Sequence, residues 1–177
     1  MEQQNAAQNK IAYPIADAMP RVDAILQDAR FRCGLERIET LEQNRIFCCH
    51  RLDHLLDVAR IAWIMVLEQQ LPLEKDIVYG AALLHDLGRY RQYEESIPHH
   101  QASAALAAEI LPDAGYTAEE TVMMVDAIGQ HGEQPLNQSV LAQVLYRADK
   151  LSRNCFQCAA QSQCKWPEEK RNRTVLY

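Results

Sequence analysis

A run of apolar residues that ends in a charged pair constrains this fold more than any other stretch of the sequence. Apolar side chains over residues 77–84 follow a helical spacing, and His85 and Asp86 come directly after them. Gly88 is a typical place for a helix to end. We therefore predict a buried helix over residues 73–88 with an imidazole and a carboxylate on its last turn. This pair suits a divalent cation, but it is common enough by chance to need support from elsewhere in the chain.

The composition favours an all-α fold with one domain. Alanine, leucine, glutamate and glutamine dominate, whereas the residues typical of strands are sparse. A length of 177 residues is sufficient for a real hydrophobic core. We expect disorder in residues 1–12, a helical core over residues 13–153, and a cysteine-containing tail over residues 154–177 that packs on the core. The polar N-terminus resembles no signal peptide and no apolar run could span a membrane, so we expect a cytoplasmic protein.

Apolar periodicity predicts further helices on both sides of the His-Asp pair. Thr117 and Glu120 form a capping-box pattern ahead of one of them, whose predicted apolar face includes Val122. Asn137 is the predicted cap of the last one. We expect a polar loop over residues 89–98 and a turn over residues 112–115. The further helices are predicted over residues 20–34, 35–44, 50–69, 99–111, 117–131 and 137–151.

Three of the predicted helices carry residues that could bind one metal ion. His54 lies on the helix over residues 50–69, and Asp149 interrupts the apolar stripe of the last helix. A buried aspartate is costly unless it is paired or bound to a cation. If His54, His85, Asp86 and Asp149 meet, they form an incomplete coordination shell that leaves room for water and substrate. Otherwise they are unrelated polar residues on amphipathic helices.

The order and spacing of these residues resemble the signature of the HD-domain superfamily. The segments that carry the resemblance are His54-Leu-Leu-Asp-Val-Ala59, His85-Asp86 and Ala148-Asp149-Lys150. The resemblance implies a helical bundle around one or two divalent ions (Mn, Fe, Co, Ni, Mg or Zn). It also implies metal-dependent hydrolysis of phosphoesters, often nucleotides. A Gly-Tyr-Pro motif does not follow the His-Asp pair, which argues against the cyclic dinucleotide phosphodiesterases.

The resemblance further implies roles for several other residues. Asp86 would orient or deprotonate the attacking water, while Arg89 and Lys150 would hold the phosphate. Some members of the superfamily bind a second metal through additional histidines, and His50 lies one helical turn before His54. The alternative for the later histidines is a solvent-exposed place in a loop or at a helix end. The candidates for the second metal are His50, His99, His100 and His131.

A cysteine cluster follows the last candidate metal ligand. Cys155, Cys158 and Cys164 lie within ten residues, and Cys33, Cys48 or Cys49 could supply a fourth thiolate. In a cytoplasmic protein such a spacing favours a zinc site or an iron–sulfur cluster that clamps the tail onto the core. The alternative is reduced cysteines that only pack.

The charge distribution narrows the class of partner. A net charge of −6 argues against general nucleic-acid binding, although residues 147–173 are locally basic and could face a phosphate. The leading hypothesis is therefore a metal-dependent phosphohydrolase that acts on a small phosphorylated molecule, with a homo-oligomer also compatible with the sequence. The alternatives are a di-iron oxygenase of the HD type and a non-catalytic nucleotide-binding module.

Overall fold

Every regular element in the part of the chain that the structure describes is a helix, which confirms the predicted fold class. The computed structural model describes residues 18–132 and 138–177. The disorder predicted for residues 1–12 and the cap predicted at Asn137 lie outside these ranges. The helices are α1 (Pro20–Gln27), α2 (Ala29–Leu41), α3 (Leu52–Glu68), α4 (Lys75–Leu84), α5 (Arg89–Glu95), α6 (His99–Asp113), α7 (Ala118–Gln130) and α8 (Val140–Leu151).

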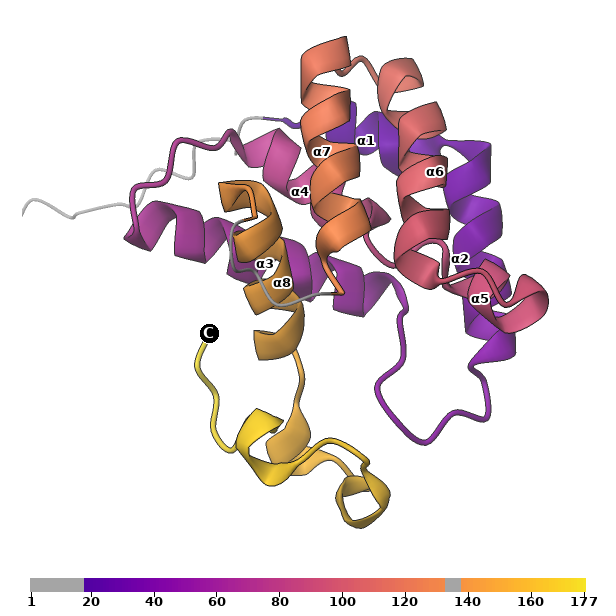
Figure 1. Cartoon of the computed structure of the whole chain (residues 1–177), viewed down its shortest axis with the longest axis vertical. Coiled ribbons are helices and arrows are strands. Elements are labelled where there is room, and N and C mark those ends of the chain that lie inside the picture. Colours follow the sequence, from indigo (N-terminus) through magenta and orange to yellow (C-terminus); the bar gives the residue numbers. More distant parts are fainter. Residues whose placement is uncertain (1–17, 133–137) are drawn as a thin grey trace, which may run out of the picture.

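Helix α4 forms the centre of the bundle (Figure 1). It packs against α1, α3, α6, α7 and α8, while α6 and α7 lie side by side and α8 crosses α3. The side chains of Leu83 and Leu84 at the end of α4 are fully buried. The residues that follow Leu84 are therefore delivered into the middle of the bundle. In the described part of the chain, no helix is both long and apolar enough to cross a bilayer.

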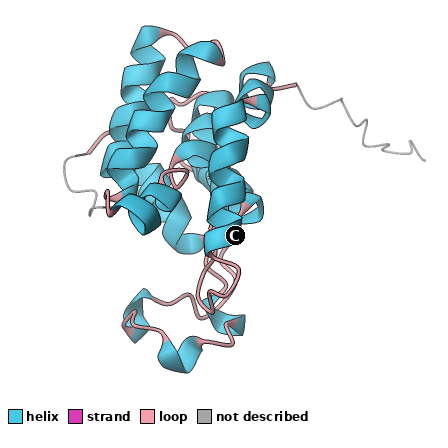
Figure 2. Ribbon diagram, turned by 90° about the vertical axis from the view of Figure 1, so that its right-hand side faces the viewer, coloured by secondary structure: helices cyan, strands magenta, loops and turns pink. Residues whose placement is uncertain are grey.

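The tail after α8 lies apart from the helical bundle (Figure 2). It is a ring of loops with three short 3₁₀ turns, at Cys155–Gln157, Gln161–Gln163 and Glu168–Lys170. Asn172 fastens the ring to α8, because its side-chain amide donates to the carbonyl oxygens of Lys150, Leu151 and Arg153 at 2.8–3.1 Å. The ring therefore begins and ends at the C-terminal end of α8.

The first two predicted helices have the wrong boundary. The helical course is interrupted at Asp28, between α1 and α2. The carboxylate of Asp28 accepts from the backbone N–H groups of Arg30 and Phe31 and so caps α2. Gly34 does not end a helix but lies buried within α2, where a Cβ atom would come within 2.8 Å of Leu87. The glycine at this position permits close packing with the turn that follows α4.

The polar loop predicted over residues 89–98 is also wrong, because residues 89–95 form α5. Tyr90 is the buried side chain of this short helix and contacts Arg37 of α2. The helix ends at Ser96, which adopts a left-handed conformation (φ +60°) shortly before Pro98. A single buried aromatic residue among charged neighbours gives too little periodicity to identify such a helix from sequence.

Smaller differences concern the later helices. Helix α6 continues through Pro112 to Asp113, so the turn lies at residues 114–115. The capping box of Thr117 and Glu120 is present as predicted. Val122, however, is 70% exposed, and the buried face of α7 consists of Met124, Ala127 and Ile128.

Gly88 allows the turn after α4 to pack directly on the backbone of α6. Its N–H donates to the buried hydroxyl of Ser103 at 2.8 Å. A Cβ atom at this position would lie 2.3 Å from the backbone nitrogen of Ser103, which is part of α6 and cannot move independently. The segment that carries His85 and Asp86 is therefore held between α4 and α6 by a residue that must be glycine.

We predict that Gly88→Ala lowers the free energy of unfolding by about 1–3 kcal/mol, the usual cost of overpacking. Gly129→Ala is the matched control, because its Cβ would meet only Ala104 at an ordinary 3.8 Å and alanine favours helix. Urea unfolding of both variants measures the difference. Equal stabilities for the two variants would contradict the proposed close contact.

Candidate metal centre

The centre of the site is the carboxylate of Asp86, which is 1% exposed. It lies in the turn between α4 and α5, with His85 as the C-terminal cap of α4. Both carboxylate oxygens are buried without a hydrogen-bond partner, as are the Nε2 atoms of His54 and His85. Buried polar atoms without hydrogen-bond partners are costly in a folded protein, and oxygens and nitrogens of this kind can ligate a bound cation. The donor set therefore fits a metal ion.

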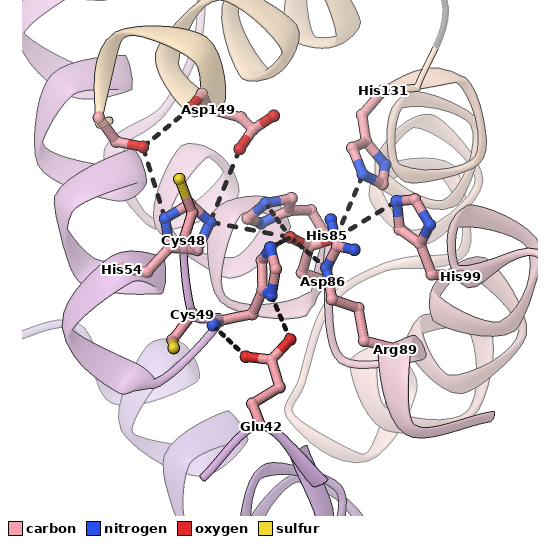
Figure 3. A network of polar contacts seen from close by, with 12 residues as sticks. Glu42, Cys48, Cys49, His54, His85, Asp86, Arg89, His99, His131 and Asp149 are labelled. Carbon is pink, nitrogen blue, oxygen red and sulfur yellow. Dashed lines mark hydrogen bonds and ion pairs between the residues drawn. The ribbon is translucent and has the colours of Figure 1, made fainter. Parts of the chain in front are cut away.

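Five imidazoles surround Asp86, each with its Nε2 atom within 4 Å of the carboxylate, and Figure 3 shows four of them, His54, His85, His99 and His131, around Asp86. On the Oδ2 side the Nε2 atoms lie at 3.3–3.8 Å, and they belong to His50, His54 and His85. On the Oδ1 side they lie at 3.4 and 3.5 Å, and they belong to His99 and His131. The carboxylate thus separates two groups of nitrogen donors.

These residues form two sets whose ligand atoms could each reach one ion. The first is the predicted set of His54, His85, Asp86 and Asp149, whose four donor atoms all lie within 4.8 Å of one another. Asp149 joins it from α8, with its Oδ1 atom 3.6 Å from His54 Nε2. The second set is Asp86, His99 and His131, which meets the same criterion. Asp86 belongs to both sets.

The other ring nitrogen of each histidine fixes its orientation. His85 and His131 donate from Nδ1 to the carbonyl oxygens of Ala82 and Ile128, at 2.7 and 2.6 Å. A carbonyl can only accept, so Nδ1 holds the proton and the Nε2 lone pair faces Asp86. His99 Nδ1 lies 2.7 Å from the Gln92 side-chain oxygen. This arrangement leaves the nitrogen lone pairs available to a metal.

His50 reaches the site by a different route from the predicted one. It does not share a helical face with His54, because α3 begins at Leu52 and His50 lies in the segment before it. The Glu42 carboxylate holds it instead, accepting from His50 N–H at 2.7 Å and from Nδ1 at 2.6 Å. The Tyr93 hydroxyl donates to the same carboxylate.

Glu42 was missed by the sequence reasoning. It is 2% exposed and follows Ile38 by one helical turn, so a carboxylate continues a buried stripe. That pattern was the available signal. His100 lies beside His99, with ring centroids 5.6 Å apart, and belongs to neither of the two ligand sets.

Charges nearby keep the buried carboxylates ionised. Desolvation raises the pKa of Asp86. The guanidinium of Arg89 and the imidazole of His85 have the opposite and larger effect, so the pKa lies well below its usual range. The pKa of Asp149 is also lowered, because Lys150 and His85 outweigh its desolvation. Desolvation lowers the pKa of His99 to about 3, so this ring is neutral at physiological pH. Anionic carboxylates and neutral imidazoles are the protonation states that bind metals.

Five of the candidate metal ligands line a cavity of about 970 Å³: His50, His54, His99, His131 and Asp149. Arg89 contributes to its wall and forms an ion pair with Asp86, with 2.9 Å between Arg89 Nε and Asp86 Oδ2. Lys150 also lines the cavity and pairs with Asp149. Further cationic side chains come from the segment before α3 and from the tail: Arg45, Arg51, Arg153, Lys165, Lys170 and Arg171. The cavity therefore favours an anionic ligand.

The cysteines that were candidates for a metal site divide into two groups. Cys33 is exposed on α2 and does not line this cavity, whereas Cys48, which is also exposed, and the partly buried Cys49, Cys155, Cys158 and Cys164 do. None of the six cysteines, all of which lie in the described residues, forms a disulfide.

Known proteins resemble this chain in sequence and in structure. A family model described as HD domain matches residues 51–154. An uncharacterized protein of Clostridium beijerinckii is 40% identical over 159 residues, which cover 90% of this chain and 100% of the relative. The crystal structure of a predicted HD superfamily hydrolase from an uncultured Thermotogales bacterium matches with a TM-score of 0.61 and 20% identity. The match covers 80% of this chain and 79% of that chain, and at 20% identity it demonstrates a shared fold.

We predict that Glu42→Gln destabilises the metal-free protein by about 2 kcal/mol at neutral pH. Desolvation raises the pKa of Glu42, but its hydrogen bonds with His50 and Tyr93 lower it more, to about 2. A lowered carboxyl pKa stabilises the fold above the unfolded-state value of about 4.3, and this contribution disappears as the pH falls toward 2. The difference between wild type and variant should therefore shrink over that interval.

Urea unfolding at several pH values, in the presence of a chelator, measures this difference. Glu39→Gln is the matched control, because Glu39 is an exposed residue of the same helix, and it should change stability little at any pH. A constant difference between wild type and Glu42→Gln from neutral pH to pH 2 would contradict the role of the carboxylate.

Proposed function

Because the chain belongs to the HD domain family, we propose that it is a metal-dependent phosphohydrolase whose substrate is a nucleotide or a similar small phosphorylated metabolite. The observation that carries this proposal is the division of five imidazoles between the two oxygens of Asp86. One carboxylate placed between two groups of donors is suited to bridging two ions.

The two ligand sets assign residues to each ion. His54, His85, Asp86 and Asp149 would hold the first, with His50 on the same side of Asp86. His99 and His131 would hold the second, together with the other oxygen of Asp86. Nitrogen and carboxylate donors together suit Mn, Fe, Co, Ni or Zn, and the carboxylates also suit Mg. Bound divalent ions supply a water of lowered pKa and neutralise charge on phosphoryl oxygens.

Cationic side chains would bind and orient the phosphate. Arg89 forms an ion pair with Asp86, and Lys150 forms one with Asp149. Each cation therefore directly contacts a candidate metal ligand. An arginine can contact a phosphate through two parallel N–H groups, which orients the group as well as holding it. The cavity volume of about 970 Å³ is sufficient for a molecule of nucleotide size. These features support a phosphoester over an uncharged substrate.

A di-iron oxygenase is the second candidate, because the histidine-rich donor set also suits iron. The basic lining of the cavity favours the phosphohydrolase. A module that binds nucleotides without turnover accounts less well for four buried side-chain atoms of His54, His85 and Asp86 that lack a hydrogen-bond partner.

We predict that Asp149→Ala lowers phosphate release by about 100-fold or more, since one carboxylate of the first ligand set is lost. The assay follows phosphate release from a panel of phosphoesters by protein loaded with Mn, Fe, Co, Ni, Mg or Zn. Asp57→Ala is the matched control, because Asp57 also lines the cavity but pairs with Arg60 on the outer face of α3. It should retain activity close to that of the wild type.

Three outcomes would oppose the proposal. Undiminished phosphate release by Asp149→Ala would exclude this site as the source of activity. Dioxygen uptake by iron-loaded protein without phosphate release would favour the oxygenase. Tight nucleotide binding without turnover under every metal would favour the binding module.

A further inference from the structure

The tail after α8 lacks a hydrophobic core of its own. Of residues 154–177, all of which the structure describes, Ala160 alone is buried. The large apolar side chains at the end of the chain, Val175 and Leu176, are exposed. A segment of this size that buries so little apolar surface does not gain enough from the hydrophobic effect to offset the entropy lost on ordering. Small folded units of this kind usually depend on disulfides or metals.

Polar contacts close the ring but do not replace a core. The guanidinium of Arg171 donates to the carbonyl oxygens of Trp166, Gln161 and Cys164 at 2.7–3.1 Å. Arg153 lies over the ring of Trp166, with 4.7 Å between the guanidinium carbon and the ring centroid. Such contacts near the surface contribute little each, because water competes for the same groups. A stronger interaction is needed to hold the ring in one conformation.

Three cysteines of the ring lie at its turns. Cys155 begins the first 3₁₀ turn, and Cys158 follows it and donates its N–H to the Cys155 carbonyl oxygen at 3.3 Å. Cys164 follows the second turn. All three are partly buried and line the cavity. A Cys-x2-Cys pair on a tight turn is a common way of presenting two thiolates to one metal.

The structure identifies Cys48 as the residue that approaches this cluster from the helical core. It lies in the segment between α2 and α3 and lines the same cavity. Desolvation and the thiols of Cys155 and Cys158 raise the pKa of the Cys48 thiol, and Arg153 lowers it.

Two other cysteines are left out of the proposed group of ligands. The sulfur of Cys49 points away from that of Cys48 (Figure 3) and lies near the carbonyl oxygens of its own loop, at 3.5 Å from Phe47. Cys33 is exposed on α2, away from the cavity.

We propose that Cys48, Cys155, Cys158 and Cys164 form a second metal site, separate from the histidine and aspartate centre, that binds a thiolate-preferring group: a zinc ion or an iron–sulfur cluster. Cations near the ring, Arg153, Lys165 and Arg171 among them, offset the negative charge of four thiolates. The site joins the tail to the segment before α3. It thereby fixes one wall of the cavity, including Arg153 and Lys165. The inference concerns metal content and does not depend on the proposed hydrolase activity.

Full-length protein purified without oxygen and without added metal tests this proposal. We expect about one zinc per chain held by thiolates, or iron with an equal amount of acid-labile sulfide. Cys48→Ser and Cys158→Ser should lose most of this metal, whereas the matched controls Cys33→Ser and Cys49→Ser should keep it. Asp149→Ala should also keep it, which separates the thiolate site from the histidine and aspartate centre.

Alkylation of the wild-type protein gives a second measurement that requires no variant to fold. Mass spectrometry should find Cys33 modified rapidly, and the four proposed ligands modified only after a strong chelator removes the metal. Zinc tied to these cysteines supports a mononuclear site, and iron with sulfide supports a cluster. Equal alkylation of all the cysteines before chelation, or a metal content unchanged in Cys158→Ser, would overturn the proposal.

Discussion

A buried carboxylate surrounded by imidazoles is the interaction on which the rest of this structure depends. Asp86 is almost completely inaccessible, and removing such a charge from water is costly unless other groups compensate. Arg89 supplies one compensating charge, and His85 and His131 donate from Nδ1 to backbone carbonyls and so turn their Nε2 lone pairs toward the carboxylate. Lone pairs facing an anion repel it weakly in the absence of a cation. The arrangement is therefore consistent with a fold that reaches its full stability when metal is bound.

The bundle is built to bring these groups together from distant parts of the chain. Central helix α4 ends in the turn that carries His85 and Asp86, and Gly88 allows this turn to lie against α6. Helices α3 and α8 then supply His54 and Asp149 from one side, while α6 and the end of α7 supply His99 and His131 from the other. The division of donors around Asp86 thus follows from which helices flank α4. A displacement of α6 would therefore affect both His99 on the Oδ1 side and the turn that carries Asp86.

The sequence alone predicted the parts of the site that a motif or a strong helical period reveals. The structure brings together the four predicted ligands His54, His85, Asp86 and Asp149. They could be predicted because a polar residue within an apolar stripe is visible without knowledge of the fold. Glu42 was missed because its role depends on a contact with His50, eight residues later and outside any helix. The helical course of residues 89–95 was missed because one buried tyrosine does not establish a period. Periodicity indicates that such a residue is buried, but it does not indicate which distant residue it contacts.

The segment between α2 and α3 links the two sets of candidate ligands. It begins at Glu42, which orients His50 toward Asp86, and it includes Cys48, which faces the tail. Only one residue separates Cys48 from His50, so a group bound at the thiol would constrain the position of the imidazole. The short chain between them has few free dihedral angles. Ordering of the tail would then also order the Oδ2 side of the centre, and the Oδ1 side would depend instead on the packing of α6 and α7.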